Sequence, residues 1–192
     1  MANPSLTERT ALKEWSVLVD ATVRGDVIAI VRKGGIREQR AGFAVRHERF
    51  LFYPTFFHEK VNELAAQLVP RLEESHARRP DPGTVRIEYV ADVVGTWAVT
   101  DLETLRSIGA EHGLAWNAVE SRFYYKNTHG VHVVALRVSR LPAAAIIPEI
   151  NRYQGCVSWV ELDDGIDVSG AIPVLDEATL AMRVAALRNT LG

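Results

Sequence analysis

The chain has 192 residues, of which 47% are hydrophobic and 24% carry a charge. This composition excludes a disordered chain, and the length leaves room for a buried core, with one domain as the default. The net charge of -2 excludes a surface that is basic throughout, so any contact with nucleic acid needs a local basic patch.

The first half of the chain is expected to hold two helices with short strands between them. Apolar residues at helical spacing from Leu12 to Val23 predict a helix that begins at Thr7 and is ended by Gly25. The other elements expected here are strands over 26–31, 43–45 and 49–53, the last ended by Pro54, and a helix over 58–75.

Strands predominate in the second half. Residues 84–99 are expected to form one long bent strand or two strands, with Gly95 at the bend. Thr100 and Glu103 form a capping box that predicts a short helix, and Asp176 is expected to cap the last helix. The remaining elements expected here are a helix over 116–125, a strand over 131–141 ended by Pro142, an irregular stretch over 143–151 and a final strand over 157–162.

The order of these elements predicts an α+β fold. It lacks the regular strand–helix alternation of a doubly wound sheet. We expect a mixed or antiparallel sheet of about six strands with about four or five helices. Whether the sheet stays open or curls into a small barrel is left undecided by the pattern.

One cysteine, Cys156, is present, so no intrachain disulfide is expected and a reducing compartment fits. No secretory signal is seen at the N-terminus, and no apolar run approaches the roughly 20 residues of a membrane helix. We therefore expect a cytoplasmic protein without membrane contact. Residues 1–6 are expected to be a flexible tail and 7–192 a single domain, with 79–83 as either a hinge or a surface loop.

The segment 32–38, with the sequence Arg-Lys-Gly-Gly-Ile-Arg-Glu, is the strongest candidate for chemistry. Two adjacent glycines can turn backbone N–H groups into one concavity that favours an anion, and three cations surround them. Glu38 would hold one of the arginines in place. The other reading is a tight turn with solvated charges. The residues of the predicted anion site are Arg32, Lys33, Gly34, Gly35 and Arg37.

Two histidines are candidates for a general base. His58 is expected at a helix start, where the helix dipole favours the neutral imidazole that a base requires. The alternative is that both are surface or capping histidines. The candidate set for an enzyme on a phosphorylated substrate is His47 and His58, with Arg32 and Arg37 as the anion clamp and Thr55 and Arg137 in support.

Three further patterns have both a functional and a simpler structural explanation. Pro80-Asp81 followed by Glu88 resembles part of the restriction-type nuclease dyad, but the lysine that should follow is missing. Cys156 lacks a histidine partner in the sequence, so a small buried residue is favoured over a nucleophile. No metal site and no cofactor are expected. The aromatic residues Trp116, Phe123, Tyr124 and Tyr125, interleaved with Arg122 and Lys126, could stack bases or could pack in the core.

Several separated motifs lie in order along the chain. They are Leu-Lys-Glu-Trp at 12–15, the segment 32–38, Phe-Leu-Phe-Tyr-Pro-Thr at 50–55 with His58, Leu-Arg-Val at 136–138, Leu-Pro at 141–142, and Tyr-Gln-Gly-Cys-Val-Ser-Trp-Val at 153–160. Together they resemble family eighteen-oh-two of the domain-of-unknown-function series, over about residues 10–165. The resemblance implies no activity, substrate or cofactor. Some members of that family are joined to a restriction-endonuclease-type domain, which implies a restriction or defence context with this domain as the recognising module.

A second and weaker resemblance concerns the fold alone. The order of a helix, a glycine, a strand and an arginine-bearing loop is similar to that in small barrel domains of the PUA and ASCH kind, which bind RNA or modified bases.

Three hypotheses about function stay open. The first is a module that binds nucleic acid or a nucleotide through the segment 32–38, the second is the histidine enzyme, and the third is a scaffold protein without a small-molecule site. The oligomeric state is left open.

Overall fold

The computed structural model of the protein describes residues 6–33, 38–39, 42–43, 47–109, 111–125, 129–155 and 157–192. The expected α+β fold with a mixed sheet is confirmed. Seven strands form one sheet in the order β2-β7-β6-β5-β1-β8, and β9 pairs with β7. β1 and β5 are parallel, and the other pairings of this sheet are antiparallel. No described pairing joins β2 to β8, so the sheet is open.

The strands differ greatly in length. The strands of the large sheet are β1 Thr7–Trp15, β2 Ala29–Arg32, β5 Arg49–Thr55, β6 Thr84–Val99, β7 Val131–Pro148, β8 Trp159–Asp167 and β9 Ile172–Pro173. A separate two-stranded sheet consists of β3 Glu38–Gln39 and β4 Gly42–Phe43.

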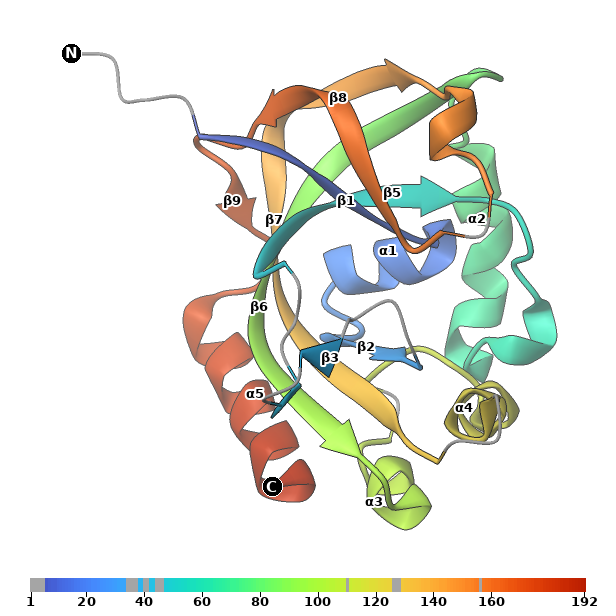
Figure 1. The fold of residues 1–192 in the computed structure, drawn as a ribbon, viewed down its shortest axis with the longest axis vertical. Helices are drawn as coiled ribbons and strands as arrows, with labels where there is room; N and C mark the ends of the chain where they lie inside the picture. Colours follow the sequence, from blue (N-terminus) through green and yellow to red (C-terminus); the bar gives the residue numbers. More distant parts are fainter. Residues whose placement is uncertain are drawn as a thin grey trace.

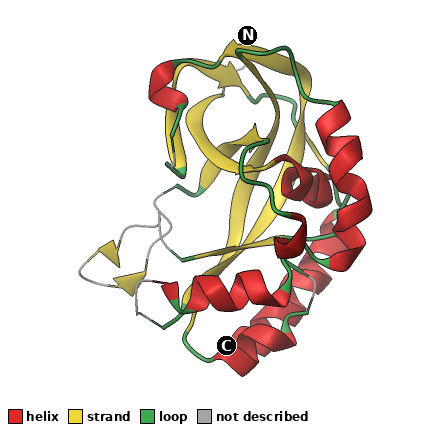
Figure 2. Cartoon of the chain, turned by 90° about the vertical axis from the view of Figure 1, so that its right-hand side faces the viewer, coloured by secondary structure: helices red, strands yellow, loops and turns green. Residues whose placement is uncertain are grey.

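The helices gather along one side and the lower end of the sheet, as Figure 2 shows. The α-helices are α1 Ser16–Val23, α2 Leu72–Ala77, α3 Leu102–Ser107, α4 Trp116–Phe123 and α5 Glu177–Leu191. The 3-10 helices are η1 Val61–Glu63, η2 Ala66–Arg71 and η4 Asn151–Tyr153. None of the helices in the described ranges is long and apolar enough to cross a membrane.

β6 and β7 are the longest strands of the sheet, and Figure 1 shows them curving together along the length of the molecule. They pair from Thr84 opposite Pro148 to Val99 opposite Val131. The pairing register shifts between Val93 and Gly95, so the expected long strand with a bend at Gly95 is confirmed. A Cβ atom on Gly95 would lie 2.3 Å from the ring of Trp97, which explains why this position takes no side chain.

Residues 7–15 form a strand, so the helix predicted from Thr7 is wrong in its first half. β1 is buried on both faces: Ala11 joins one core cluster and Leu12 another. A strand of this kind lacks the alternation of polar and apolar residues that identifies a half-exposed strand. β1 passes directly into α1, so the apolar residues of the strand and the helix together gave the three- and four-residue spacing that is typical of one helix.

The long helix predicted over 58–75 is also wrong, because only Leu72–Ala77 is an α-helix. The two 3-10 helices before it are separated by an extended stretch at Leu64. This stretch pairs with a distant segment: Ala65 N–H donates to Gly113 O at 3.0 Å, and Ala115 N–H donates to Glu63 O at 2.9 Å. The partner lies about 50 residues away in sequence, so local periodicity could not reveal the pairing.

β7 continues through Pro142 to Pro148, which corrects the prediction that Pro142 ends it and that 143–151 is irregular. Tyr89 pairs with Arg140 and Ile87 with Ala145, so Pro142 lies in a gap of the ladder where no N–H donor is needed. β8 likewise extends beyond the predicted 157–162 to Asp167. The predicted capping box is displaced by one residue, since Asp101 accepts from Thr104 N–H at 2.7 Å.

Smaller predictions fall partly on undescribed residues. The strand expected over 26–31 is β2, shifted toward the C-terminus, and the strand expected over 43–45 meets β4 only at Phe43. Residues 1–5 and 44–46 lie outside the described part of the chain. Asp176 caps α5 as predicted, by accepting from Thr179 N–H at 2.9 Å.

α1 lies in the centre of the molecule, enclosed by the curve of the sheet (Figure 1). Its residues Val17, Leu18 and Ala21 belong to the core cluster that the helices form against β2, β6 and β7. Val19 belongs to a second cluster with Phe50 and Phe52 of β5. The junction between β1 and α1 is therefore held from several sides, and this junction carries the candidate site.

Candidate functional site

Arg32 ends β2 and forms a buried ion pair with Glu14 of β1. Its Nη2 donates to Lys13 O at 2.8 Å and lies 3.2 Å from Glu14 Oε2. Only 7% of the Glu14 residue is exposed. Arg32 Nε is buried and has no hydrogen-bond partner among the residues that the structure describes. A cation at the strand end is thus held firmly, with one donor unsatisfied.

Arg122 of α4 brings a second guanidinium to the same place. It donates to Val31 O at 2.8 Å, and its guanidinium lies 6.0 Å from the centre of the Trp15 ring. Burial lowers the pKa of Arg122, while the charge of Glu14 raises it and that of Arg32 lowers it. Arg122 nevertheless stays protonated at neutral pH, as arginines do. Two guanidinium groups therefore share the carboxylate of Glu14, which favours an additional anion nearby.

Lys33 is anchored to the end of α4. Its Nζ donates to Phe123 O at 2.6 Å and to Gly130 O at 2.7 Å, and burial lowers its pKa. The last carbonyls of a helix favour a cation, so this position suits an ammonium group. Lys33 joins β2 to the C-terminus of α4 and to the start of β7.

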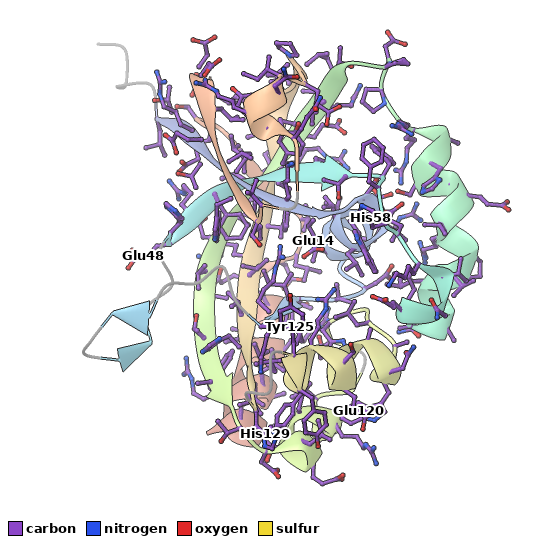
Figure 3. All side chains as sticks on the ribbon, turned by 45° about the vertical axis from the view of Figure 1, so that its right-hand side comes forward. Glu14, Glu48, His58, Glu120, Tyr125 and His129 are labelled. Carbon is purple, nitrogen blue, oxygen red and sulfur yellow. The ribbon has the colours of Figure 1, made fainter. Side chains whose placement is uncertain are left out.

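Exposed aromatic rings follow α4 next to Lys33. Tyr124 is 46% exposed and Tyr125 is 57% exposed, whereas Phe123 is buried. The ring of His129 lies 5.1 Å from that of Tyr124 and 6.0 Å from that of Phe123. Figure 3 shows Tyr125 and His129 at the same part of the molecule, beside α4. We call the surface formed by Arg32, Lys33, Tyr124, Tyr125 and His129 the β2–α4 surface.

The two histidines proposed as bases lie in different settings. The ring of His47 packs against that of Trp159 with 4.8 Å between centroids. His58 is exposed and lies in the turn after β5, with φ 62, a backbone conformation uncommon for residues other than glycine. No helix begins at His58, so the expected dipole effect on its ring does not apply. Figure 3 shows His58 at the end of β5.

The two supporting residues are separated by the fold. Thr55 ends β5 beside the buried ion pair, because its Oγ1 donates to Glu14 O at 3.2 Å. Arg137 instead binds both carboxylate oxygens of Glu177 at 2.7 Å. Arg32 pairs with His132 on β7, and Arg137 lies five residues further along, about 16 Å at the rise of a strand. The structure therefore does not bring Arg137 to Arg32.

The remaining predicted residues cannot be placed. Gly34, Gly35, Arg37 and Cys156 lie outside the described residues, as does the side chain of Glu38. In the ranges that are described, no three histidine, cysteine, aspartate or glutamate side chains gather as a metal site would require.

A large cavity, which shares no lining residue with the β2–α4 surface, was not expected from the sequence. Its volume is about 500 Å³, and segments from α1, α2, the loop 79–83, β6 and β7 surround it. The nuclease-like Asp81 and Glu88 both line it, but Glu88 binds Arg86 at 2.7 Å. We call this cavity the Arg79 groove; its charged and aromatic lining residues are Asp20, Phe56, Phe57, Arg78, Arg79, Asp81, Arg86, Glu88, Tyr89, Arg140 and Glu149.

Sequence reasoning missed Glu14 and Arg122, which complete the buried charge cluster. Glu14 fell within a stretch that was expected to be helical, so its pairing across two strands was hidden. Arg122 was noted only as a cation among aromatic residues. A carboxylate at a strand end carries no local signal of a partner that comes from a distant strand or helix.

The comparisons with known proteins name a family but no activity. No curated protein matches the chain in sequence. In structure the chain is similar to ASCH from Zymomonas mobilis, with 15% sequence identity, a TM-score of 0.42, and 93% of this chain and 94% of that chain covered. At this identity and TM-score the likeness carries no conclusion about a ligand. The family described as domain of unknown function (DUF1802) matches residues 11–186, so the predicted resemblance is confirmed and the chain belongs to that family.

Proposed function

We propose that the protein is a nucleic-acid-binding module and that the β2–α4 surface takes up a single strand. The observation that carries the proposal is the direct link between cations and exposed rings: Lys33 Nζ donates to the carbonyl of Phe123, immediately before Tyr124 and Tyr125. Proteins that bind single strands combine cations for the phosphates with aromatic rings on which bases stack.

The cations of this surface are held in place before any ligand arrives. Arg32 is oriented by Glu14 and by the carbonyl of Lys13, and its Nε lacks an acceptor among the described residues. The guanidinium of Arg122 adds a second positive charge close to that of Arg32. A phosphate at this position would offset the excess of guanidinium charge over carboxylate charge, and it would meet side chains that lose little entropy on binding.

The proposed biological context, restriction or defence, rests on the family resemblance. A restriction or defence context would require this domain to recognise nucleic acid, with cleavage supplied by another protein or domain. The enzymatic alternative has less support, because His58 is exposed in a turn and His47 packs on Trp159.

The proposal is tested by fluorescence anisotropy with labelled single-stranded RNA and DNA and with a duplex. The variant Tyr124→Ala/Tyr125→Ala should weaken single-strand binding at least about tenfold, because stacking contributes about 1–3 kcal/mol per base. Both rings are exposed, so the fold should tolerate their loss. The matched control Ile172→Ala/Met182→Ala removes two exposed apolar side chains elsewhere and should leave binding unchanged.

Binding that is as tight in the double tyrosine variant as in the parent protein would contradict the proposal. So would an affinity that does not depend on salt, because phosphate contacts release counterions.

A further inference from the structure

The Arg79 groove is large enough for a small organic molecule. Sites for such ligands have volumes of about 300–1,000 Å³, and the groove has about 500 Å³. Its lining comes from α1, the end of β5 with the residues after it, the end of α2, the loop 79–83 and β6, together with Arg140 and Glu149. Figure 1 shows α2 and the upper part of β6 on the same side of the molecule.

Part of the charge in the groove is neutralised internally. Arg78 forms an ion pair with Asp20, and Arg86 forms one with Glu88. Burial raises the pKa of Asp20, against the opposing charge of Arg78. These pairs shape the walls but contribute no net charge for a ligand.

Two other arginines contact aromatic rings in place of carboxylates. The guanidinium of Arg79 lies 5.3 Å from the centres of both the Phe56 and the Phe57 rings, and that of Arg140 lies 5.7 Å from the Tyr89 ring. Within the described part of the chain neither arginine has an ion pair. Contact with a ring fixes the plane of a guanidinium and leaves its in-plane N–H groups directed outward, where they can grip an anion in bidentate fashion.

The groove also offers an aromatic face and hydrogen-bond acceptors. Phe57 is 58% exposed, which is unusual for so large an apolar side chain. Glu149 and Asp81 form no ion pair with a described residue, so their carboxylates can accept from hydroxyl or amino groups. The hydroxyl of buried Tyr53 has no hydrogen-bond partner among the described residues. Burial raises the pKa of Tyr53, and the negative charge of Glu149 adds to this, although Tyr53 itself does not line the groove.

We propose that the Arg79 groove is a second binding site, separate from the β2–α4 surface, and that it takes a nucleoside monophosphate. Arg79 and Arg140 bind the phosphate, Phe57 stacks on the base, and Glu149 accepts from the ribose hydroxyls. A nucleoside monophosphate unites the anion, the planar ring and the hydroxyl donors that these side chains match. A simple phosphate would use only the arginines, and a nucleoside would use only the ring and the carboxylate.

Isothermal titration calorimetry with the full chain tests the assignment. The titrants are AMP, GMP, CMP and UMP, with adenosine, ribose 5-phosphate and inorganic phosphate as partial ligands. At least one nucleotide should bind, and each partial ligand should bind at least about tenfold more weakly, because charge-assisted hydrogen bonds contribute about 1.5–3 kcal/mol. Ribose 5-phosphate or inorganic phosphate binding as tightly as the best nucleotide would overturn the proposal, as would no nucleotide binding at all.

Two variants and a control locate the site. Arg79→Ala and Phe57→Ala should each weaken nucleotide binding at least about tenfold. The matched control is Arg106→Ala, since Arg106 is also exposed and also lies over an aromatic ring, Trp116 at 4.4 Å, but does not line the groove. Circular dichroism and thermal unfolding of each variant show whether the fold is kept, and Phe57→Leu, which keeps an apolar side chain, provides a second variant if Phe57→Ala unfolds.

The two sites are distinguished by measuring both oligonucleotide binding and mononucleotide binding for the variants of each site. Groove variants should leave the binding of single-stranded oligonucleotides unchanged, and Tyr124→Ala/Tyr125→Ala should leave mononucleotide binding unchanged. Mononucleotide binding that is lost in the tyrosine variant and kept in Arg79→Ala would overturn the groove site while supporting the β2–α4 surface.

Discussion

Glu14 is the residue on which the buried charge cluster depends. Its carboxylate forms an ion pair with Arg32, and its charge also stabilises the guanidinium of Arg122; both arginines are largely removed from solvent. Removing one partner of a buried ion pair is costly because the other charge stays buried without compensation. The cluster holds the end of β2 in place, and with it the cations that the β2–α4 surface presents.

Glu14→Gln is therefore expected to destabilise the protein by about 3 kcal/mol, because it leaves two guanidinium groups without their shared carboxylate. Urea unfolding followed by tryptophan fluorescence measures the loss. Glu177→Gln is the matched control, since Glu177 also binds an arginine but its side chain is 74% exposed, and it should cost less than about 1 kcal/mol. Equal losses in the two variants would contradict the role of Glu14.

His112 is expected to make the stability of the fold depend on pH. The residue is 5% exposed, and its Nδ1 accepts from Leu114 N–H at 3.1 Å. Burial, with the charge of Arg122 in addition, lowers the pKa of His112 from 6.5 to about 4. In the unfolded chain the ring takes up its proton near the usual pKa, whereas the folded chain resists protonation until the pH is much lower.

Stability should therefore be fully present above about pH 6.5 and fall as the pH drops toward about 4. The difference in pKa corresponds to about 3 kcal/mol over this window. The variant His112→Asn keeps an acceptor for Leu114 N–H but cannot be protonated, so its stability should fall less between neutral pH and about pH 4.5. Urea unfolding of both proteins across this range provides the measurement, and parallel curves would rule out this role for His112.

At the scale of elements, the junction of β1 and α1 explains both the site and the limits of prediction. β1 reaches Trp15 and α1 begins at Ser16, so no turn separates strand from helix. Such a junction leaves no glycine, proline or polar cluster to mark it. The sequence indicated the cations at 32–33, but it left open whether the aromatic residues at 123–125 are exposed, and it did not show that α4 would return beside β2.

Predictions succeeded where local chemistry decides the structure. Asp176 caps α5 through a contact three residues away, and β6 bends at Gly95 because only glycine fits beside Trp97. They failed where a distant partner decides. The extended stretch at Leu64 depends on a bridge to Leu114, and the groove depends on a loop, two helices and three strands that meet only in the folded chain.

Gly95→Ala tests the bend of β6. The new Cβ would meet the Trp97 ring at 2.3 Å, and Trp97 is packed in the helix-covered core. Overpacking of this kind costs about 1–3 kcal/mol. In a Trp97→Leu background the ring is gone, so the same substitution should cost clearly less. Chemical unfolding of the four proteins of this cycle gives the coupling, and strict additivity would show that the ring is not the cause.

At the scale of the whole molecule, the distribution of charge matters more than its sum. The chain carries a net charge of -2, so nonspecific attraction to nucleic acid should be weak. The β2–α4 surface nevertheless contains Arg32 and Lys33, and Arg122 adds a further positive charge next to Arg32. Binding should therefore be local, and few phosphates should be neutralised.

The salt dependence of binding measures that number. For a single strand, the slope of log K against log salt concentration is about -0.7 for each phosphate neutralised, so contacts from Arg32 and Lys33 predict about -1.4. Lys33→Gln should make the slope shallower by about 0.7, while its amide can still donate to one of the two carbonyls that hold Lys33. Arg79→Ala should leave the slope unchanged, because its guanidinium lies in the groove. A slope that responds to Arg79→Ala and not to Lys33→Gln would move the nucleic-acid site from the β2–α4 surface to the groove.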